Sequence, residues 1–283
     1  MKIEEAHVLW EEGKLAEALK VLSEVENKDV DTLQDIGLIN LELGEIESAS
    51  EIFNSLIQMD PDFAGGYYGL AICMDEIGDT EEALTYYLKT LMVDSRHTAA
   101  YIAVGDIFAS DKSDDCLAYY ETACELSPDY WLPVSSIGDY YQSIEEYEKA
   151  IEYYGNAIDI EPSFWSYHGL GFSYDRLGEV ESAISAYKEG LALNDYSYTH
   201  FNLGVIYKDL SDYEQSLTHY NKALESHKDV VFYYNRGCLY NLMGETELAK
   251  KDLLVSFEKS QNLKSYSLED LELKNIKEWL LSL

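Results

Sequence analysis

Small and aromatic residues recur along this chain at a nearly constant interval. A large apolar or aromatic residue returns every 31 to 34 positions, with one small residue four positions before it and another further upstream. The large series is Leu22, Phe53, Tyr87, Tyr120, Tyr154, Tyr187, Tyr220 and Leu253. The small series are Ala18, Ala49, Ala83, Cys116, Ala150, Ala183, Ser216 and Ala249, and Ala6, Gly37, Ala71, Gly105, Gly138, Gly171, Gly204 and Gly237. Because three series keep one register, we expect a tandem array of eight repeats.

Within each repeat the apolar positions return at helical spacing in two blocks, which predicts a pair of helices. In one repeat these helices cover about 198–210 and 213–226. In four repeats the turn between them contains glycine, at Gly44, Gly78, Gly178 and Gly244. Glycine is favoured there because it adopts the left-handed conformation that ends a helix. Gly204 and Ser216 lie twelve residues apart, one on each helix, so we expect the two helices to cross closely at these small residues, with Tyr220 beside them.

The segments 67–91, 136–162 and 234–253 carry all three series. They resemble the tetratricopeptide repeat family, whose unit is a helix–turn–helix of about 34 residues. The resemblance covers most of the chain. It implies an all-α fold, a right-handed α-solenoid superhelix of about eight helix–turn–helix repeats plus a C-terminal capping helix. Such a scaffold has many partners, so the resemblance indicates the fold more strongly than the function.

The register predicts where the repeats and the final segment lie. The repeats are expected at about 1–29, 30–63, 64–97, 98–130, 131–163, 164–196, 197–229 and 230–263, within an array over 1–263. Residues 264–283 are predicted to form a single capping helix, because Ser267 and Asp270 resemble a capping box before a run of apolar positions. The alternative is a tail helix that binds a partner.

The charge excludes several classes of function. Twenty Lys and Arg against 54 Asp and Glu give a net charge of −34, which disfavours nucleic acid and anionic membranes as partners. No apolar run reaches the ~18 residues of a membrane span. The four cysteines form no Cys-x-x-Cys pair, so we expect reduced thiols and a cytoplasmic protein.

Known catalytic and metal-binding patterns are missing from the sequence. There is no phosphate-binding loop, no zinc-protease motif and no nucleophile elbow, and the six histidines are scattered without zinc spacing. Asp111, Ser113 and Asp115 match the start of a calcium loop, but Cys116 replaces its required glycine and Thr122 its final glutamate. We therefore expect no enzyme, no metal site and no cofactor.

The resemblance implies that ligands bind the concave side, which the first helix of each repeat lines. The candidate groove residues are Tyr68, Asp75, Asp106, Asp139, Trp165, His168, Phe172, Arg176, Tyr198, Phe201, Asn202, Lys208, Tyr234 and Asn235. Glu76, Asp175 and Asp209 extend the acidic series on the same side. The alternative for the aromatic residues is that they pack between neighbouring first helices. The alternative for the carboxylates is that they reflect the acidity of the whole chain.

Asn202 and Asn235 occupy equivalent places one repeat apart. In peptide-binding relatives an asparagine there holds the peptide backbone, because its amide both donates and accepts hydrogen bonds. A clamp for a ligand carboxylate is disfavoured, since Arg176 and Lys208 are the only basic residues nearby. The predicted function is a non-catalytic scaffold that binds a segment with basic and apolar residues. The alternative is a structural protein that self-assembles into dimers or filaments through its terminal repeats, with a weak homo-oligomer as its simplest form.

Overall fold

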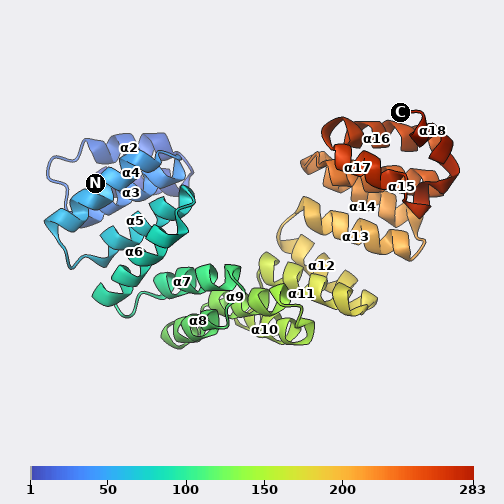
Figure 1. Ribbon diagram of the computed structural model, residues 1–283. Coiled ribbons are helices and arrows are strands. Elements are labelled where there is room, and N and C mark those ends of the chain that lie inside the picture. The colour runs from blue at the N-terminus through green and yellow to red at the C-terminus, as the bar shows by residue number, and fades with distance from the viewer. Residues whose placement is uncertain (1) are drawn as a thin grey trace. The chain divides into compact units, whose positions relative to one another are not determined.

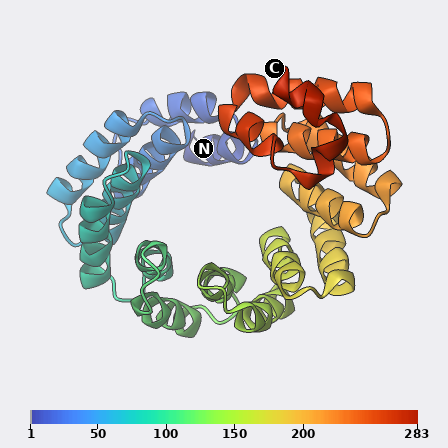
Figure 2. The same cartoon turned by 45° about the vertical axis from the view of Figure 1, so that its right-hand side comes forward.

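The computed structural model describes residues 2–283, and in that range it contains 18 α-helices, one short 3-10 helix and no strand (Figure 1). The expected all-α fold is confirmed. The chain forms two compact parts, Met1–Ile144 and Glu145–Leu283, which we describe separately. Within each part, successive helices lie side by side in antiparallel pairs (Figure 2).

The N-terminal part holds nine helices among its described residues. They are α1 (Lys2–Glu11), α2 (Leu15–Ser23), α3 (Val30–Glu42), α4 (Ile46–Met59), α5 (Ala64–Glu76), α6 (Thr80–Val93), α7 (Thr98–Ser110), α8 (Asp115–Leu126) and α9 (Trp131–Ser143). Apolar residues form cores that join neighbouring pairs, such as Ala49, Phe53 and Leu56 of α4 with Leu70 of α5.

The C-terminal part continues the same pattern. It consists of α10 (Tyr147–Ile160), α11 (Phe164–Leu177), α12 (Val180–Leu193), α13 (Ser197–Asp209), α14 (Tyr213–Ser226), α15 (Val230–Leu242), α16 (Thr246–Lys259), α17 (Gln261–Ser267), η1 (Leu271–Ile276) and α18 (Lys277–Leu281). The fifth expected repeat is therefore divided, since α9 belongs to one part and α10 to the other.

The predicted turn glycines adopt the left-handed conformation, with φ between 77° and 83°. Three turns use a residue that is not glycine in this conformation: Lys112, Glu145 and Ser211. Side-chain caps begin two of the second helices, α6 and α14. Asp212, for example, accepts a hydrogen bond from the Gln215 amide at 3.2 Å, which satisfies one free N–H of the first turn of α14.

The small-residue series marks close helix crossings, as expected. A Cβ atom added to Gly204 would lie 2.5 Å from the Tyr220 ring, and one added to Gly105 would lie 2.5 Å from the Tyr120 ring. The Ser216 hydroxyl donates to the Gly204 carbonyl at 2.7 Å, which ties α14 to α13 at the crossing. A larger side chain at these glycines has no room.

The C-terminal segment differs from the expected single helix over 264–283. It folds as α17, η1 and α18, and the proposed capping box is wrong. Ser267 lies inside α17 and donates to the Lys264 carbonyl, while Asp270 caps η1 by accepting from the Glu272 amide. The chain breaks after Ser267 because three short elements bring Leu273, Ile276 and Leu280 onto the core of Phe257 and Leu253. No helix among residues 2–283 is long and apolar enough to cross a membrane.

Candidate protein-binding face

The first helices of the pairs carry the predicted site residues, and we call the surface they form in each part the first-helix face. In the N-terminal part, α5, α7 and α9 present Asp75, Asp106 and Asp139 to solvent. The Tyr87 hydroxyl donates to Asp75 at 2.9 Å, and the Tyr120 hydroxyl donates to Asp106 at 2.7 Å. The repeating tyrosines therefore reach from between the helices to this face and fix two of its carboxylates.

The environment of Asp106 disfavours its charged form. The side chain of Asp106 reaches solvent, but the helices packed around it still reduce its hydration, and this desolvation raises the pKa of the carboxyl to about 6. The Tyr120 hydrogen bond opposes the effect, and the neighbouring Asp139 and Asp75 add to it. Tyr68 lies beside these groups but is half-buried, with its ring 4.5 Å from His97 and 5.7 Å from Tyr87. It packs between helices more than it faces solvent.

In the C-terminal part a continuous row of rings lies at the start of α11 and α13. The Trp165 ring is 5.7 Å from Tyr196, which is 5.6 Å from Tyr198. Trp165 is 56% exposed and Tyr198 is 38% exposed. We call Trp165, Tyr196 and Tyr198 the aromatic strip. Tyr196 was not predicted, because it lies in the loop between repeats rather than on a first helix.

The other predicted aromatic residues follow the alternative and pack between neighbouring first helices. Phe201 stacks on Phe232 of α15 at 4.8 Å. Phe172 packs against the core around Tyr187. The His168 Nδ1 atom lies 2.8 Å from the Thr199 hydroxyl of α13, and burial lowers the pKa of His168 to about 4. The His168 ring also lies 5.9 Å from Tyr196 of the strip, and Phe232, on which Phe201 stacks, lies 5.1 Å from Tyr198.

Two carboxylates lie further along the same helices. Asp175 is half-buried on α11 and Asp209 is exposed at the end of α13. Burial raises the pKa of Asp175, and the charge of Asp209 raises it further. Arg176 lies next to Asp175 but donates to the Tyr147 hydroxyl at 3.2 Å. Among residues 2–283, no Lys, Arg or His nitrogen lies within 4 Å of either carboxylate, so neither forms an ion pair.

The two equivalent asparagines make different contacts. The Asn202 amide donates to the Tyr187 hydroxyl at 3.1 Å, whereas the Asn235 amide donates to the Val231 carbonyl of its own helix at 2.9 Å. The Tyr220 hydroxyl corresponds to that of Tyr187 one repeat later, and it is buried without a hydrogen-bond partner. The repeat symmetry of the sequence therefore does not extend to these side-chain contacts.

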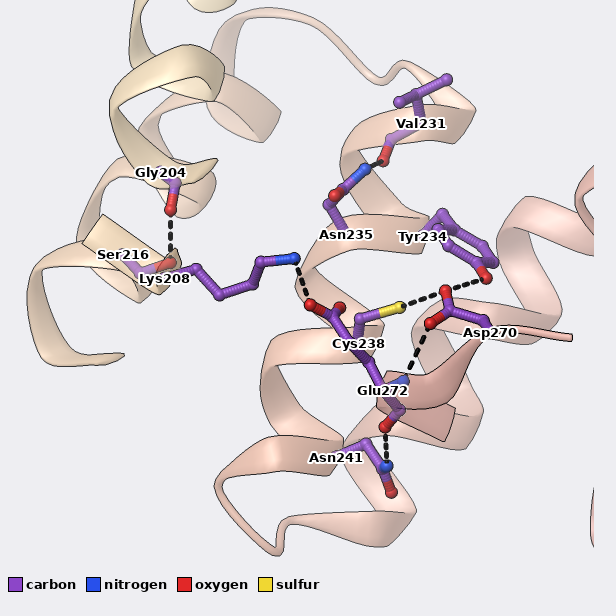
Figure 3. Close-up of polar contacts among 10 residues, drawn as sticks. All are labelled: Gly204, Lys208, Ser216, Val231, Tyr234, Asn235, Cys238, Asn241, Asp270 and Glu272. Atoms are coloured by element: carbon purple, nitrogen blue, oxygen red, sulfur yellow. Dashed lines mark hydrogen bonds and ion pairs between the residues drawn. The ribbon is translucent and has the colours of Figure 1, made fainter. Parts of the chain in front are cut away.

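The C-terminal segment covers the last first helix (Figure 3). Glu272 extends from η1 toward α13, where its carboxylate lies 2.7 Å from the Lys208 ammonium. The Tyr234 hydroxyl donates to Asp270 at 2.6 Å, and the Asn241 amide donates to the Glu272 carbonyl at 2.6 Å. Tyr234 is only 5% exposed as a result. Two predicted groove residues, Lys208 and Tyr234, thus contact the C-terminal segment of the same chain.

Cys238, Asp270 and Glu272 place their ligand atoms within 4.8 Å of one another. Each already has a partner, since the thiol lies 3.8 Å from Asp270, Tyr234 donates to Asp270, and Lys208 pairs with Glu272. Burial and the nearby carboxylates raise the pKa of the Cys238 thiol, which favours its uncharged form. The arrangement is a satisfied polar contact between the C-terminal segment and α15.

Curated relatives match only part of this chain. A 107-residue region, 38% of the chain, is 25% identical to anaphase-promoting complex subunit 3 of Schizosaccharomyces pombe, and a 120-residue region, 41%, is 25% identical to the CTR9 homolog of Arabidopsis thaliana. These regions span only 16% and 11% of the length of the two relatives.

Solved structures resemble the fold over nearly the whole chain. A chain in the APC/C hetero-tetramer Cut9-Hcn1 matches 98% of this chain and 55% of its own length, with a TM-score of 0.70 at 20% identity. A tetratricopeptide repeat protein from Parabacteroides merdae matches 88% of this chain and 97% of its own length, with a TM-score of 0.63 at 16% identity.

Family models agree with the repeat pattern. Models described as tetratricopeptide repeat match residues 35–100, 135–164, 166–196, 197–229 and 230–254, which together make up more than half of the chain. The matched segments contain the same small and aromatic series that form the helix crossings. The chain belongs to the tetratricopeptide repeat family.

Proposed function

We propose that this chain is a non-catalytic scaffold that binds a protein segment carrying basic and apolar residues on its first-helix face. The family membership supports a role in protein interaction. The observation that carries the finer proposal is the exposed aromatic strip, whose Trp165 and Tyr198 lie on the same two helices as the carboxylates of Asp175 and Asp209. A cytoplasmic location is part of this proposal.

The aromatic strip has the chemistry of a binding hot spot. Large aromatic residues contribute much of the energy of protein interfaces when a partner removes them from water. Trp165 and Tyr198 retain exposed ring surface although Phe164, Tyr196 and Phe232 hold them in place. A rigid apolar anchor loses little conformational entropy on binding, so we place the apolar residues of the partner on these rings.

The carboxylates give the partner its charge. Arg176 and Lys208 are adjacent to Asp175 and Asp209 in the sequence, but Arg176 donates to Tyr147 and Lys208 pairs with Glu272. The chain as a whole carries a charge of −34. Such a surface attracts Lys and Arg over distances of about 10 Å at 0.1 M salt and repels acidic segments. On this proposal Asp75, Asp106 and Asp139 form a second basic-residue site in the N-terminal part.

Lys208, Tyr234 and Asn235 are assigned a different role. The C-terminal segment already holds Lys208 and Tyr234, so we place the ligand on α11 and α13 and not on α15. Asn202 remains a candidate for a contact with the backbone of the ligand. Its amide now donates to the Tyr187 hydroxyl and could donate to a ligand carbonyl instead.

A peptide-display selection on the immobilised protein tests the proposal. We expect enriched peptides to combine Lys or Arg with apolar residues, and a synthetic peptide from that pool to bind the wild type. The double variant Trp165→Ala/Tyr198→Ala should weaken binding by a factor of 30 or more, about 2 kcal/mol, as for a hot spot. Tyr266→Ala is the matched control, because Tyr266 is at least as exposed as Trp165 and Tyr198 but lies in α17.

Two outcomes would contradict the proposal. One is enrichment of acidic peptides, and the other is a double variant that binds as tightly as the control variant. The self-assembly alternative makes a separate prediction, an apparent mass that rises with concentration in light scattering. A constant monomer mass would remove that alternative without affecting the groove proposal.

A further inference from the structure

A buried histidine pair joins α13 to α14. His200 is 4% exposed and His219 is 9% exposed, and their Nδ1 atoms lie 2.9 Å apart. The other nitrogen of His200, Nε2, lies 2.7 Å from the carboxylate of Asp195 in the loop before α13. The pair is one helical turn from the crossing of Gly204 and Ser216 and forms a second polar contact between the two helices.

The geometry fixes where the protons are. A carboxylate only accepts hydrogen bonds, so Nε2 of His200 carries the proton that is donated to Asp195. A neutral imidazole has one N–H, which leaves Nδ1 of His200 as an acceptor and makes Nδ1 of His219 the donor. The pair can take up one further proton and keep this hydrogen bond. If both rings become charged, two N–H groups face each other at 2.9 Å and the contact must break.

Charged groups from every neighbouring segment act on this pair. Lys188 of α12 and Lys222 of α14 disfavour additional positive charge, while Asp195 of the preceding loop and Glu225 of α14 favour it. Tyr207 of α13 stacks on His219 with ring centroids 5.5 Å apart. Burial is the largest influence on both rings: it lowers the pKa of His200 and, with the positive neighbours, lowers the pKa of His219 to about 4.

The same place in another repeat is filled without histidine. Tyr101 lies four residues before Gly105, as His200 lies four before Gly204, and Tyr119 lies three after Cys116, as His219 lies three after Ser216. Phe108 stacks on Tyr119 at 5.5 Å and 15°, which is the geometry of Tyr207 on His219. Two tyrosines therefore hold α7 to α8 where two histidines hold α13 to α14, and the repeat itself does not require a titratable pair.

We propose that the His200–His219 pair is a proton-sensitive latch, and that protonation of both imidazoles loosens α14 from α13. The proposal concerns the helix pair itself and requires no ligand. Because α13 also carries Tyr198 of the aromatic strip, loosening α13 would weaken the binding of a ligand to the strip. Only that consequence rests on the proposed function.

The direction of the pH effect follows from the lowered pKa values. An unfolded histidine has a pKa of about 6.5, so the unfolded helix pair binds protons more readily than the folded one below this pH. The contribution of the histidine pair to the stability of the α13–α14 contact is therefore fully present above about pH 6.5 and is lost as the pH drops toward 4. With a folded pKa of about 4 for His219 alone, the opening equilibrium at pH 5 should rise about 30-fold relative to pH 7.5.

Hydrogen exchange measured by mass spectrometry on the full chain tests this inference. Protection factors, corrected for the intrinsic pH dependence of exchange, are compared at pH 7.5 and 5.0. We expect protection of 213–226 to fall about 30-fold in the wild type, while α5 and α6 provide an internal reference without histidine. The matched variant is His200→Tyr/His219→Tyr, which copies the pair of α7 and α8 and should show no such fall.

An equal fall in the wild type and the tyrosine variant would overturn the proposal, as would no fall in the wild type. If the tyrosine variant does not fold, Asp195→Asn provides a second test. It removes the carboxylate that favours the charged pair, so the fall in protection should become larger, and a smaller or unchanged fall would contradict the latch. Long-range ¹H–¹⁵N spectra of the imidazoles at pH 7.5 should show the proton on Nε2 of His200 and on Nδ1 of His219, and the opposite tautomers would also overturn it.

Discussion

The Ser216 hydroxyl donates to the Gly204 carbonyl at 2.7 Å across the crossing of α13 and α14. This contact is possible because residue 204 has no side chain, and the Tyr220 ring fills the space that a Cβ atom would need. Gly204, Ser216 and Tyr220 thus pack together at one helix crossing, and residues at the same spacing recur along the chain.

We expect Gly204→Ala to destabilise the protein even though alanine favours helix. The added Cβ would lie 2.5 Å from the buried Tyr220 ring, and overpacking of this kind costs about 1–3 kcal/mol. Gly155→Ala in α10 is the control, because no atom lies within 4 Å of its Cβ position, and it should stabilise by about 0.5–1 kcal/mol. Thermal melting followed by circular dichroism measures both effects. If the melting midpoints of both variants rose above that of the wild type, the helix crossing at Gly204 would have room for a Cβ atom.

The ion pair between Lys208 and Glu272 should couple the C-terminal segment to α13. Its side chains are more buried than those of a surface pair, so a double-mutant cycle with Lys208→Met and Glu272→Gln should give a coupling on the order of 1 kcal/mol. The exposed pair of Lys14 and Glu12, at 2.6 Å, is the control and should give a smaller coupling, because solvent screens its charges. Equal coupling energies from urea unfolding would show that burial adds nothing to the first pair.

The raised pKa of Asp106 makes a prediction about pH. An unfolded aspartate has a pKa of about 3.9, so the folded protein binds a proton at this site more readily. The stability from protonating Asp106 is therefore full below about pH 3.9 and is lost as the pH rises through about 6. Asp106→Asn keeps an acceptor for Tyr120 but cannot ionise, so it should stabilise the protein at pH 7.5 relative to wild type.

Urea unfolding of wild type and Asp106→Asn at pH 7.5 and 4.5 measures this effect. The gain at pH 7.5 should shrink markedly at pH 4.5, where the wild-type carboxyl is already largely protonated. Asp209→Asn serves as a control for the same substitution at another exposed first-helix carboxylate. A gain for Asp106→Asn that is the same at both pH values would mean that ionisation is not the cause.

The fold could be predicted from the sequence because it depends on short-range spacing. Gly204, Ser216 and Tyr220 recur with their equivalents in other repeats, and each crossing is made within about 20 residues of chain. The exposed strip was predictable in part, since Trp165 and Tyr198 lie on first helices at equivalent positions. Phe201 was predicted in the groove but packs on Phe232, because periodicity gives a side of the helix and not the amount of water that reaches it.

The contacts of the C-terminal segment could not be predicted in the same way. Lys208 and Glu272 are 64 residues apart, and nothing in the repeat register pairs them. The break after Ser267 depends on how Leu273 and Leu280 fit the core of the last helix pair, which is a tertiary effect. The histidine pair had a signal that alignment of the repeats could have found, because His200 and His219 stand where another repeat has Tyr101 and Tyr119.

The last prediction separates the roles of charge and aromatic surface in ligand binding. Replacement of Asp175 and Asp209 by asparagine should slow association of a basic peptide and reduce its dependence on salt, because these carboxylates act at long range before contact is made. Dissociation should change little. Trp165→Ala should do the reverse, since loss of a short-range anchor mainly accelerates dissociation. Surface plasmon resonance with a peptide from the display selection, at 50 and 300 mM sodium chloride, gives both rates. If the asparagine variants accelerated dissociation and left association unchanged, the carboxylates would be direct contacts in the bound state, and long-range attraction would not explain the preference for basic partners.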